Sequence, residues 1–161
     1  MSDNGSRKKP VNGAHALLAK GRKDGVAEVS VSIRSDRDII IARQRGKELA
    51  ASIGFSGTDL TLIATAISEL SRNIVIYAKL GEISLEPIWL DGRIGIKVVA
   101  RDDGPGIPDV HQALRDGFST SRSLGLGLPG VRRLMDTFEL VSVVNRGTTV
   151  TVKKWANSRG D

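Results

Sequence analysis

Apolar residues recur along this 161-residue chain with two different periods, and each period predicts a type of element. In residues 28–33 they alternate with serines, which is typical of a half-buried strand. In residues 36–54 and 58–78 they recur every three or four positions, which predicts two amphipathic helices. Ser35 is a suitable N-terminal cap for the first helix, and Gly54 is a suitable end.

The second predicted helix carries a carboxylate and an amide beside its apolar stripe. The stripe, which we expect to be buried, consists of Leu60, Ile63, Ile67, Leu70, Ile74 and Tyr77. At about 100° per residue, Glu69 and Asn73 lie roughly 90–130° from the centre of the stripe, one turn apart on one flank. This pair is expected at the edge of the core, although Glu and Asn four positions apart are also common on solvated faces. Gly81 lies just beyond the expected end of the helix near Ala78.

Two hairpins are predicted in the rest of the chain. Their strands are residues 82–90 and 94–102, then 138–144 and 148–155. Asp91-Gly92 is a strong hairpin signal in the first, Asn145-Arg146-Gly147 forms the turn of the second, and Pro87 indicates an edge position or a bulge. A short helix is expected after Pro108. The order predicts an α+β domain with a largely antiparallel sheet and helices on one face.

Composition and charge exclude several classes of protein. The chain has no cysteine, which excludes disulfides and thiolate metal sites, and its two histidines, His15 and His111, lie far apart. It has no apolar run of the roughly 20 residues that span a bilayer. Residues 1–25 carry six basic and two acidic side chains, or +4 of the net charge of +6. No aromatic residue accompanies these charges, which removes the stacking platform of a protein that binds single-stranded nucleic acid. We expect a cytoplasmic protein without membrane or nucleic-acid partners.

Two glycine-rich turns stand out between the hairpins. The first, Asp102-Asp103-Gly104-Pro105-Gly106, begins where a predicted strand ends, and the second, Gly125-Leu126-Gly127-Leu128-Pro129-Gly130, leads into a helical pattern. Glycines spaced two apart let a backbone approach a flat or anionic group, because no Cβ intervenes. At a helix N-terminus, free N–H groups can also bind an anion. The turns therefore predict a nucleotide site, with the polar residues 118–123 as a movable cover.

Common nucleotide motifs do not account for these glycines. Gly125-x-Gly127-x-x-Gly130 has the dinucleotide-binding spacing, but no strand precedes it, and Asn145 stands where an acid is needed. The sequence has no P-loop and no V-A-I-K, H-R-D or D-F-G motif. More specific is the order of four motifs, which are Glu69-x-x-x-Asn73, Asp102-x-Gly104-x-Gly106, the second turn, and Gly147-Thr148.

These motifs resemble the N, G1, G2 and terminal Gly-Thr boxes of the GHKL ATP-binding superfamily, which has the Bergerat fold. Four blocks are similar, in order, to the RsbT-type serine-protein kinases of bacterial stressosome modules, and they are residues 66–74, 102–108, 116–121 and 127–136. The resemblance covers about residues 28–155 and implies a two-layer sandwich with a mixed, mostly antiparallel sheet, in a kinase domain over residues 27–156. We expect residues 1–26 to be a flexible basic extension and residues 157–161 to be a tail.

The resemblance also implies a role for each motif residue, with ATP and Mg²⁺ as cofactors. Asp102 would bind the adenine amino group with help from Thr148, Asn73 would bind Mg²⁺, and Glu69 would deprotonate the attacking hydroxyl. A lid over residues 118–123 would cover the site. The expected contacts to the base, ribose and phosphates are Gly104, Gly106, Arg122, Gly125, Gly127 and Gly130.

The implied function is phosphorylation of Ser or Thr on a STAS-domain partner of the RsbS/RsbR kind. Once released, the kinase would bind and activate an effector such as a PP2C-type phosphatase, as part of a partner switch. The alternative is an anti-sigma factor of the RsbW/SpoIIAB type, which sequesters a sigma factor. A histidine kinase ATPase domain is disfavoured, because no helix with a phospho-accepting His precedes the expected domain.

Overall fold

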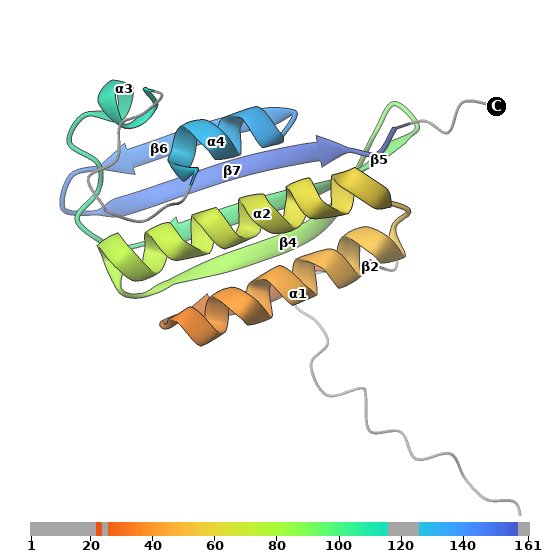
Figure 1. Cartoon of the computed structure of the whole chain (residues 1–161), viewed down its shortest axis with the longest axis horizontal. Coiled ribbons are helices and arrows are strands. Elements are labelled where there is room, and N and C mark those ends of the chain that lie inside the picture. Colours follow the sequence, from red (N-terminus) through yellow and green to blue (C-terminus); the bar gives the residue numbers. More distant parts are fainter. Residues whose placement is uncertain (1–21, 24–25, 116–125, 158–161) are drawn as a thin grey trace, which may run out of the picture.

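The computed structural model describes residues 22–23, 26–115 and 126–157, and it shows a sheet with helices on one face (Figure 1). The sheet has the strand order β3-β4-β5-β7-β6, and each described pair of neighbours is antiparallel. Its strands are β3 Val29–Ile33, β4 Gly81–Leu90, β5 Arg93–Asp102, β6 Thr137–Val143 and β7 Gly147–Trp155. The predicted strands and the α+β class are thereby confirmed.

Three helices cover the sheet, and α2 lies between the other two (Figure 1). These three are α1 Asp36–Ser52, α2 Gly57–Asn73 and α4 Gly127–Leu134, and a short fourth helix, α3 Val110–Ala113, lies at one end of the sheet, all four as predicted. The core lies between the two layers, and its fully buried members include Ile33, Ile63, Ile67, Ile83, Leu85, Ile96, Val98, Val131 and Val152. Gly46 brings α1 close to α2, because a Cβ at this position would overlap Cδ1 of Ile67.

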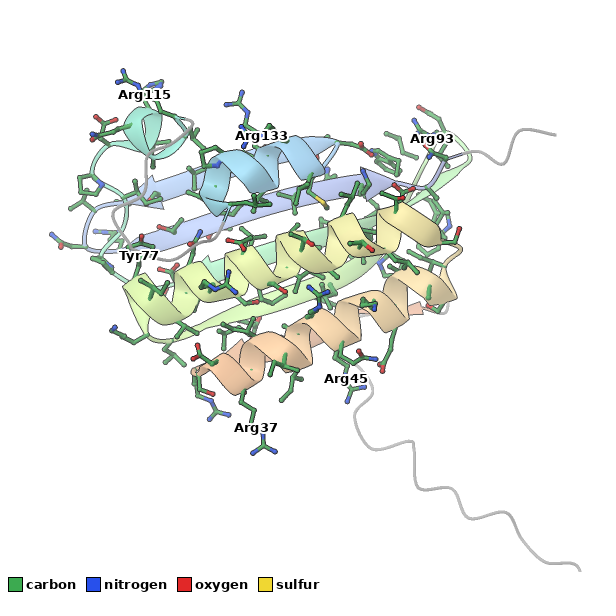
Figure 2. The ribbon with its side chains drawn as sticks, viewed as in Figure 1. Arg37, Arg45, Tyr77, Arg93, Arg115 and Arg133 are labelled. Atoms are coloured by element: carbon green, nitrogen blue, oxygen red, sulfur yellow. The ribbon has the colours of Figure 1, made fainter. Side chains whose placement is uncertain are left out.

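The second helix ends differently from the prediction. After Asn73, residues Ile74–Ala78 form a π-helical turn (η1), and Lys79 ends it with a φ of 70°. A π turn holds more residues than an α turn and therefore rotates the side chains that follow. Tyr77, expected in the buried stripe, is 46% exposed and lies at this end of the helix (Figure 2), whereas Ile74 is 2% exposed. Gly81 lies beyond the end of the helix, as expected, and is the first residue of β4.

The structure explains both Asp91-Gly92 and Pro87 in the first hairpin. Asp91 and Gly92 both have positive φ, 50° and 74°, as a tight two-residue hairpin turn requires. Pro87 lies in β4, which is not an edge strand of the sheet. However, the pairing of β3 with β4 stops at Leu85, so the missing N–H of Pro87 costs no ladder hydrogen bond on that side.

The segment before the sheet departs in part from its expected irregular structure. Arg22–Lys23 (β1) and Val26–Ala27 (β2) form a short antiparallel pair. The predictions for residues 1–21, for the lid over 118–123 with Arg122, for Gly125 and for most of the tail fall outside the described residues. Within the described part, no helix is both long and apolar enough to cross a membrane.

Candidate functional site

Glu69 lies near the C-terminal end of α2 and faces α4. It is only 7% exposed, and a carboxylate with so little exposure requires hydrogen-bond donors. One donor is the backbone N–H of Gly127, the first residue of α4, at 3.4 Å from Oε2 of Glu69. The N-terminal end of a helix carries a partial positive charge, which favours a carboxylate there. Two residues 58 positions apart in the sequence, both predicted as site residues, are thus brought together.

The second donor to Glu69 is Arg72, one turn along the same helix. Its Nη1 lies 2.8 Å from Oε1 of Glu69, and the two side chains are 37% and 10% exposed, respectively. The two oxygens of the carboxylate therefore have different partners, a guanidinium on Oε1 and a backbone amide on Oε2.

Asn73 is the last residue of α2 and lies one turn after Glu69, on the same flank. Its side chain is half-buried and makes no hydrogen bond to another described residue. An amide oxygen is a ligand that Mg²⁺ accepts, and this ion is usually held by one or two protein groups together with substrate phosphates. The described residues contain no cluster of three acidic or histidine side chains that could hold a metal alone. Asn73 therefore suits a metal ion that arrives with a nucleotide.

The first glycine turn packs against the end of this helix. Oδ1 of Asp102, at the end of β5, accepts a hydrogen bond of 2.9 Å from the N–H of Gly104. A Cβ at Gly104 would lie 2.6 Å from the Cβ of Ala78, the last residue of η1, so only glycine allows this approach. No other hydrogen bond between described residues reaches the Asp102 carboxylate, which leaves Oδ2 available to a ligand.

The turn between β6 and β7 packs against the first glycine turn. Gly147 has a φ of 123°, and a Cβ there would overlap the carbonyl oxygen of Asp102. Gly106, with a φ of 73°, approaches the carbonyl of Val143, where a Cβ would lie 2.5 Å from the oxygen. The N–H of Asn145 also donates to the carbonyl of Pro105 at 2.8 Å. The predicted Gly-Thr motif is therefore adjacent to the first glycine turn.

Ser142 is a residue of this region that the sequence analysis missed. Its hydroxyl accepts a hydrogen bond of 2.8 Å from the N–H of Ile107 and lies 2.8 Å from the hydroxyl of Thr148. It thereby fixes Thr148 relative to the first glycine turn. Ser142 and Thr148 are direct partners in the β6–β7 ladder. The register of the second hairpin is therefore the signal that could have revealed the role of Ser142.

The second glycine turn is described from Leu126 onward. Gly127 has a φ of 62° and begins α4. Gly130 is required for local packing, because a Cβ there would overlap the side chain of Leu126. The structure thus places Gly127 at the N-terminal end of α4 beside Glu69, whereas Gly130 lies within the helix.

A separate charged cluster lies at the opposite end of α2. Lys154 is 8% exposed; its ammonium donates to the carbonyl of Leu134 at 3.2 Å and lies 3.7 Å from Asp136 and 4.0 Å from Asp59. Asp59 is ten residues before Glu69, or about 15 Å along the helix axis. A pocket beside this cluster is lined by Gly54, Phe55, Ser56, Thr58, Asp59, Ala156 and Asn157. None of these residues belongs to the predicted site, and Lys154 joins β7 to α2 and α4.

Comparisons with known proteins agree with this arrangement. Residues 35–154 match the family model of the histidine kinase-like ATPase domain. The chain is 50% identical to the serine/threonine-protein kinase RsbT of Bacillus subtilis over 125 residues, which cover 78% of this chain and 94% of that protein. It is 34% identical to the anti-sigma F factor of Geobacillus stearothermophilus over 130 residues, 76% of this chain and 87% of the relative.

A solved structure agrees in fold. The crystal structure of the RsbU and RsbW domains of a Mycobacterium tuberculosis protein superposes with a TM-score of 0.57 at 19% identity, over 83% of this chain and 34% of the other. The family match, the close relative and the convergence of the four motifs at one end of the sheet lead to the same conclusion. The chain belongs to the histidine kinase-like ATPase (GHKL) family and, within it, to the RsbT-type serine/threonine-protein kinases.

Proposed function

We propose that this kinase transfers the γ-phosphoryl group of ATP to a Ser or Thr hydroxyl on a STAS-domain protein of the RsbS/RsbR kind. Once released from that protein, it binds and activates an effector such as a PP2C-type phosphatase, in the cytoplasm and as part of a stress-signalling partner switch. The observation that carries the catalytic part is the contact between Glu69 and Gly127, which brings a buried carboxylate to the N-terminal end of α4.

The nucleotide is held by groups from several parts of the chain. Oδ2 of Asp102 accepts a hydrogen bond from the adenine amino group, and Thr148, fixed by Ser142, assists. Gly104 and Gly106 let the first turn lie close to the base and ribose, and the N-terminal end of α4 faces the phosphates. Asn73 would hold Mg²⁺, and the ion would supply neutralisation of phosphate charge. Gly125, Gly130 and Arg122 complete the expected phosphate contacts, with Arg122 on the γ-phosphate.

Glu69 acts as the general base. It accepts the proton of the substrate hydroxyl while the hydroxyl oxygen bonds to the γ-phosphorus and displaces ADP. Phosphoryl transfer depends mainly on alignment and charge neutralisation, so one base, one metal ion and a phosphate-binding turn are sufficient. A positioned base typically contributes about 10²–10⁴-fold to the rate.

A second candidate function is sequestration of a sigma factor. It is favoured by the 34% identity to an anti-sigma F factor. The higher identity of 50% to a serine/threonine kinase supports the first candidate. The two differ in the partner that the chain retains, so a binding experiment distinguishes them.

The decisive experiment combines transfer of labelled phosphate with partner capture. The purified chain is incubated with labelled ATP, Mg²⁺ and the STAS proteins encoded beside it, and Glu69→Gln is the matched control. We expect label on the STAS protein with the unaltered chain and a loss of about 10²-fold or more with Glu69→Gln, which should still bind ATP. Capture of a sigma factor without transfer to any STAS protein would support the alternative. Equal transfer by Glu69→Gln would exclude Glu69 as the base.

A further inference from the structure

Arg72 binds the carboxylate that we assign as the base. At about 100° per residue, Arg72 lies roughly 60° around the helix from Glu69, on the side away from Asn73. The guanidinium therefore reaches Glu69 from the solvent side of α2, whereas Gly127 reaches it from the side of α4. The carboxylate is held between the two donors.

Arg72 is the one side chain that bonds to Glu69 within the described part of the chain. The hydroxyl of Ser68, the residue before Glu69, is engaged elsewhere. Ser68 donates to the carbonyl of Ala64 at 3.0 Å and accepts a bond of 3.4 Å from Arg43 of α1. Without Arg72, the backbone N–H of Gly127, at 3.4 Å, would be the remaining described donor to the carboxylate.

The contribution of this ion pair to the stability of the helix itself is small. A partly exposed ion pair between side chains three positions apart contributes little to folding, because water screens it and both side chains lose freedom. The matched pair on α1, Arg45 and Glu48, has the same spacing but a longer distance of 3.8 Å, with both side chains more than half exposed. Glu69, by contrast, is buried and has short, directed contact with its arginine.

We propose that Arg72 is a positioning residue for phosphoryl transfer, a role that rests on the proposed function of Glu69. By holding Oε1, it restricts the rotation of the carboxylate and keeps Oε2 directed at the N-terminal end of α4, where the phosphates are expected. A base must lie within hydrogen-bond reach of the proton it accepts, and a misplacement of about 1 Å can cost up to about 10²-fold in rate. The planar guanidinium holds a carboxylate in a more defined geometry than an ammonium does.

The test compares Arg72→Ala, Arg72→Lys and the control Arg45→Ala. The side chain of Arg45 lies on α1 and points away from α2 (Figure 2). We measure kcat and the KM for ATP with a STAS substrate, together with thermal unfolding of each variant. Arg72→Ala should lower kcat about tenfold with the KM for ATP within about twofold, because Arg72 acts through Glu69 and not on the nucleotide. Arg72→Lys should recover part of the loss, and Arg45→Ala should match the unaltered chain.

Three results would overturn the positioning role: an unchanged or raised kcat in Arg72→Ala, a change confined to the KM for ATP, or a loss in Arg72→Lys as large as in Arg72→Ala. If Arg72→Ala does not fold, Arg72→Lys and Arg72→Gln provide the same comparison. Glu69→Gln is measured in parallel. If it loses transfer while Arg72→Ala does not, the positioning role fails and the base assignment stands. If Glu69→Gln transfers normally, the proposed base itself is wrong.

Discussion

Asp102 and Thr148 are direct partners across the ladder between β5 and β7, at the end of the sheet where the motifs meet. Two residues 46 positions apart in the chain thus share one edge of the candidate site. Asp102 keeps one carboxylate oxygen for its own turn, through Gly104, and Thr148 is held by Ser142. The second carboxylate oxygen of Asp102 is therefore left for the adenine amino group.

Asp102→Asn should weaken ATP binding about tenfold or more without unfolding the chain. The amide oxygen of Asn can still accept the bond from Gly104, but the variant loses the charge-assisted bond to the adenine amino group. Titration calorimetry with ATP measures the change. Asp103→Asn is the matched control, since that side chain is 87% exposed, and it should bind ATP normally. Equal affinity in Asp102→Asn would exclude the adenine contact.

Asn73→Ala should remove most of the effect of Mg²⁺ on ATP binding. The side chain makes no hydrogen bond to another described residue, so its removal should leave the helix stable. The measurement compares ATP affinity with Mg²⁺ and with EDTA in both proteins. Asn73→Asp, which retains an oxygen ligand, should keep the Mg²⁺ dependence. A full Mg²⁺ effect in Asn73→Ala would show that the ion is held elsewhere.

Gly147→Ala should destabilise the fold by about 2–4 kcal/mol, which combines left-handed strain with the overlap on Asp102. Gly92→Ala is the control, because Gly92 also has a positive φ, 74°, but nothing within 4 Å of the added Cβ. It should lose only about 1–2 kcal/mol, the strain alone. Urea unfolding measures both values. Equal losses would mean that the approach of Gly147 to Asp102 is not tight.

Lys154→Met should destabilise the chain by about 1–3 kcal/mol without changing ATP affinity. The substitution leaves the carbonyl of Leu134 and two partly exposed carboxylates, Asp59 and Asp136, without their cation. The cluster lies at the end of α2 opposite Glu69, so the nucleotide site should not respond. Lys153→Met, on the next position of β7, is the control and should change stability by less than about 0.5 kcal/mol. Reduced ATP affinity in Lys154→Met would contradict this and show that the charged cluster affects the nucleotide site at the other end of α2.

Local periodicity alone was sufficient to predict most elements and one edge of the site. Helix geometry places residues four apart on one flank whatever surrounds them, so Glu69 and Asn73 could be paired before any fold was known. A tight hairpin turn needs residues that accept a positive φ, so Asp91-Gly92 could also be predicted as a turn from the sequence. These features depend on neighbours within one turn or one hairpin, which a single sequence contains.

Other features depend on contacts between distant parts of the chain, and only the tertiary structure decided them. The π turn after Asn73 exposed Tyr77, although its spacing matched the buried stripe. The burial of Glu69 requires α4, and the role of Ser142 requires the register of β6 against β7 and the approach of Ile107. The sequence alone determined which groups could do the chemistry. Packing between helices and across the sheet determined which of them meet, because such contacts leave no periodic trace in the chain.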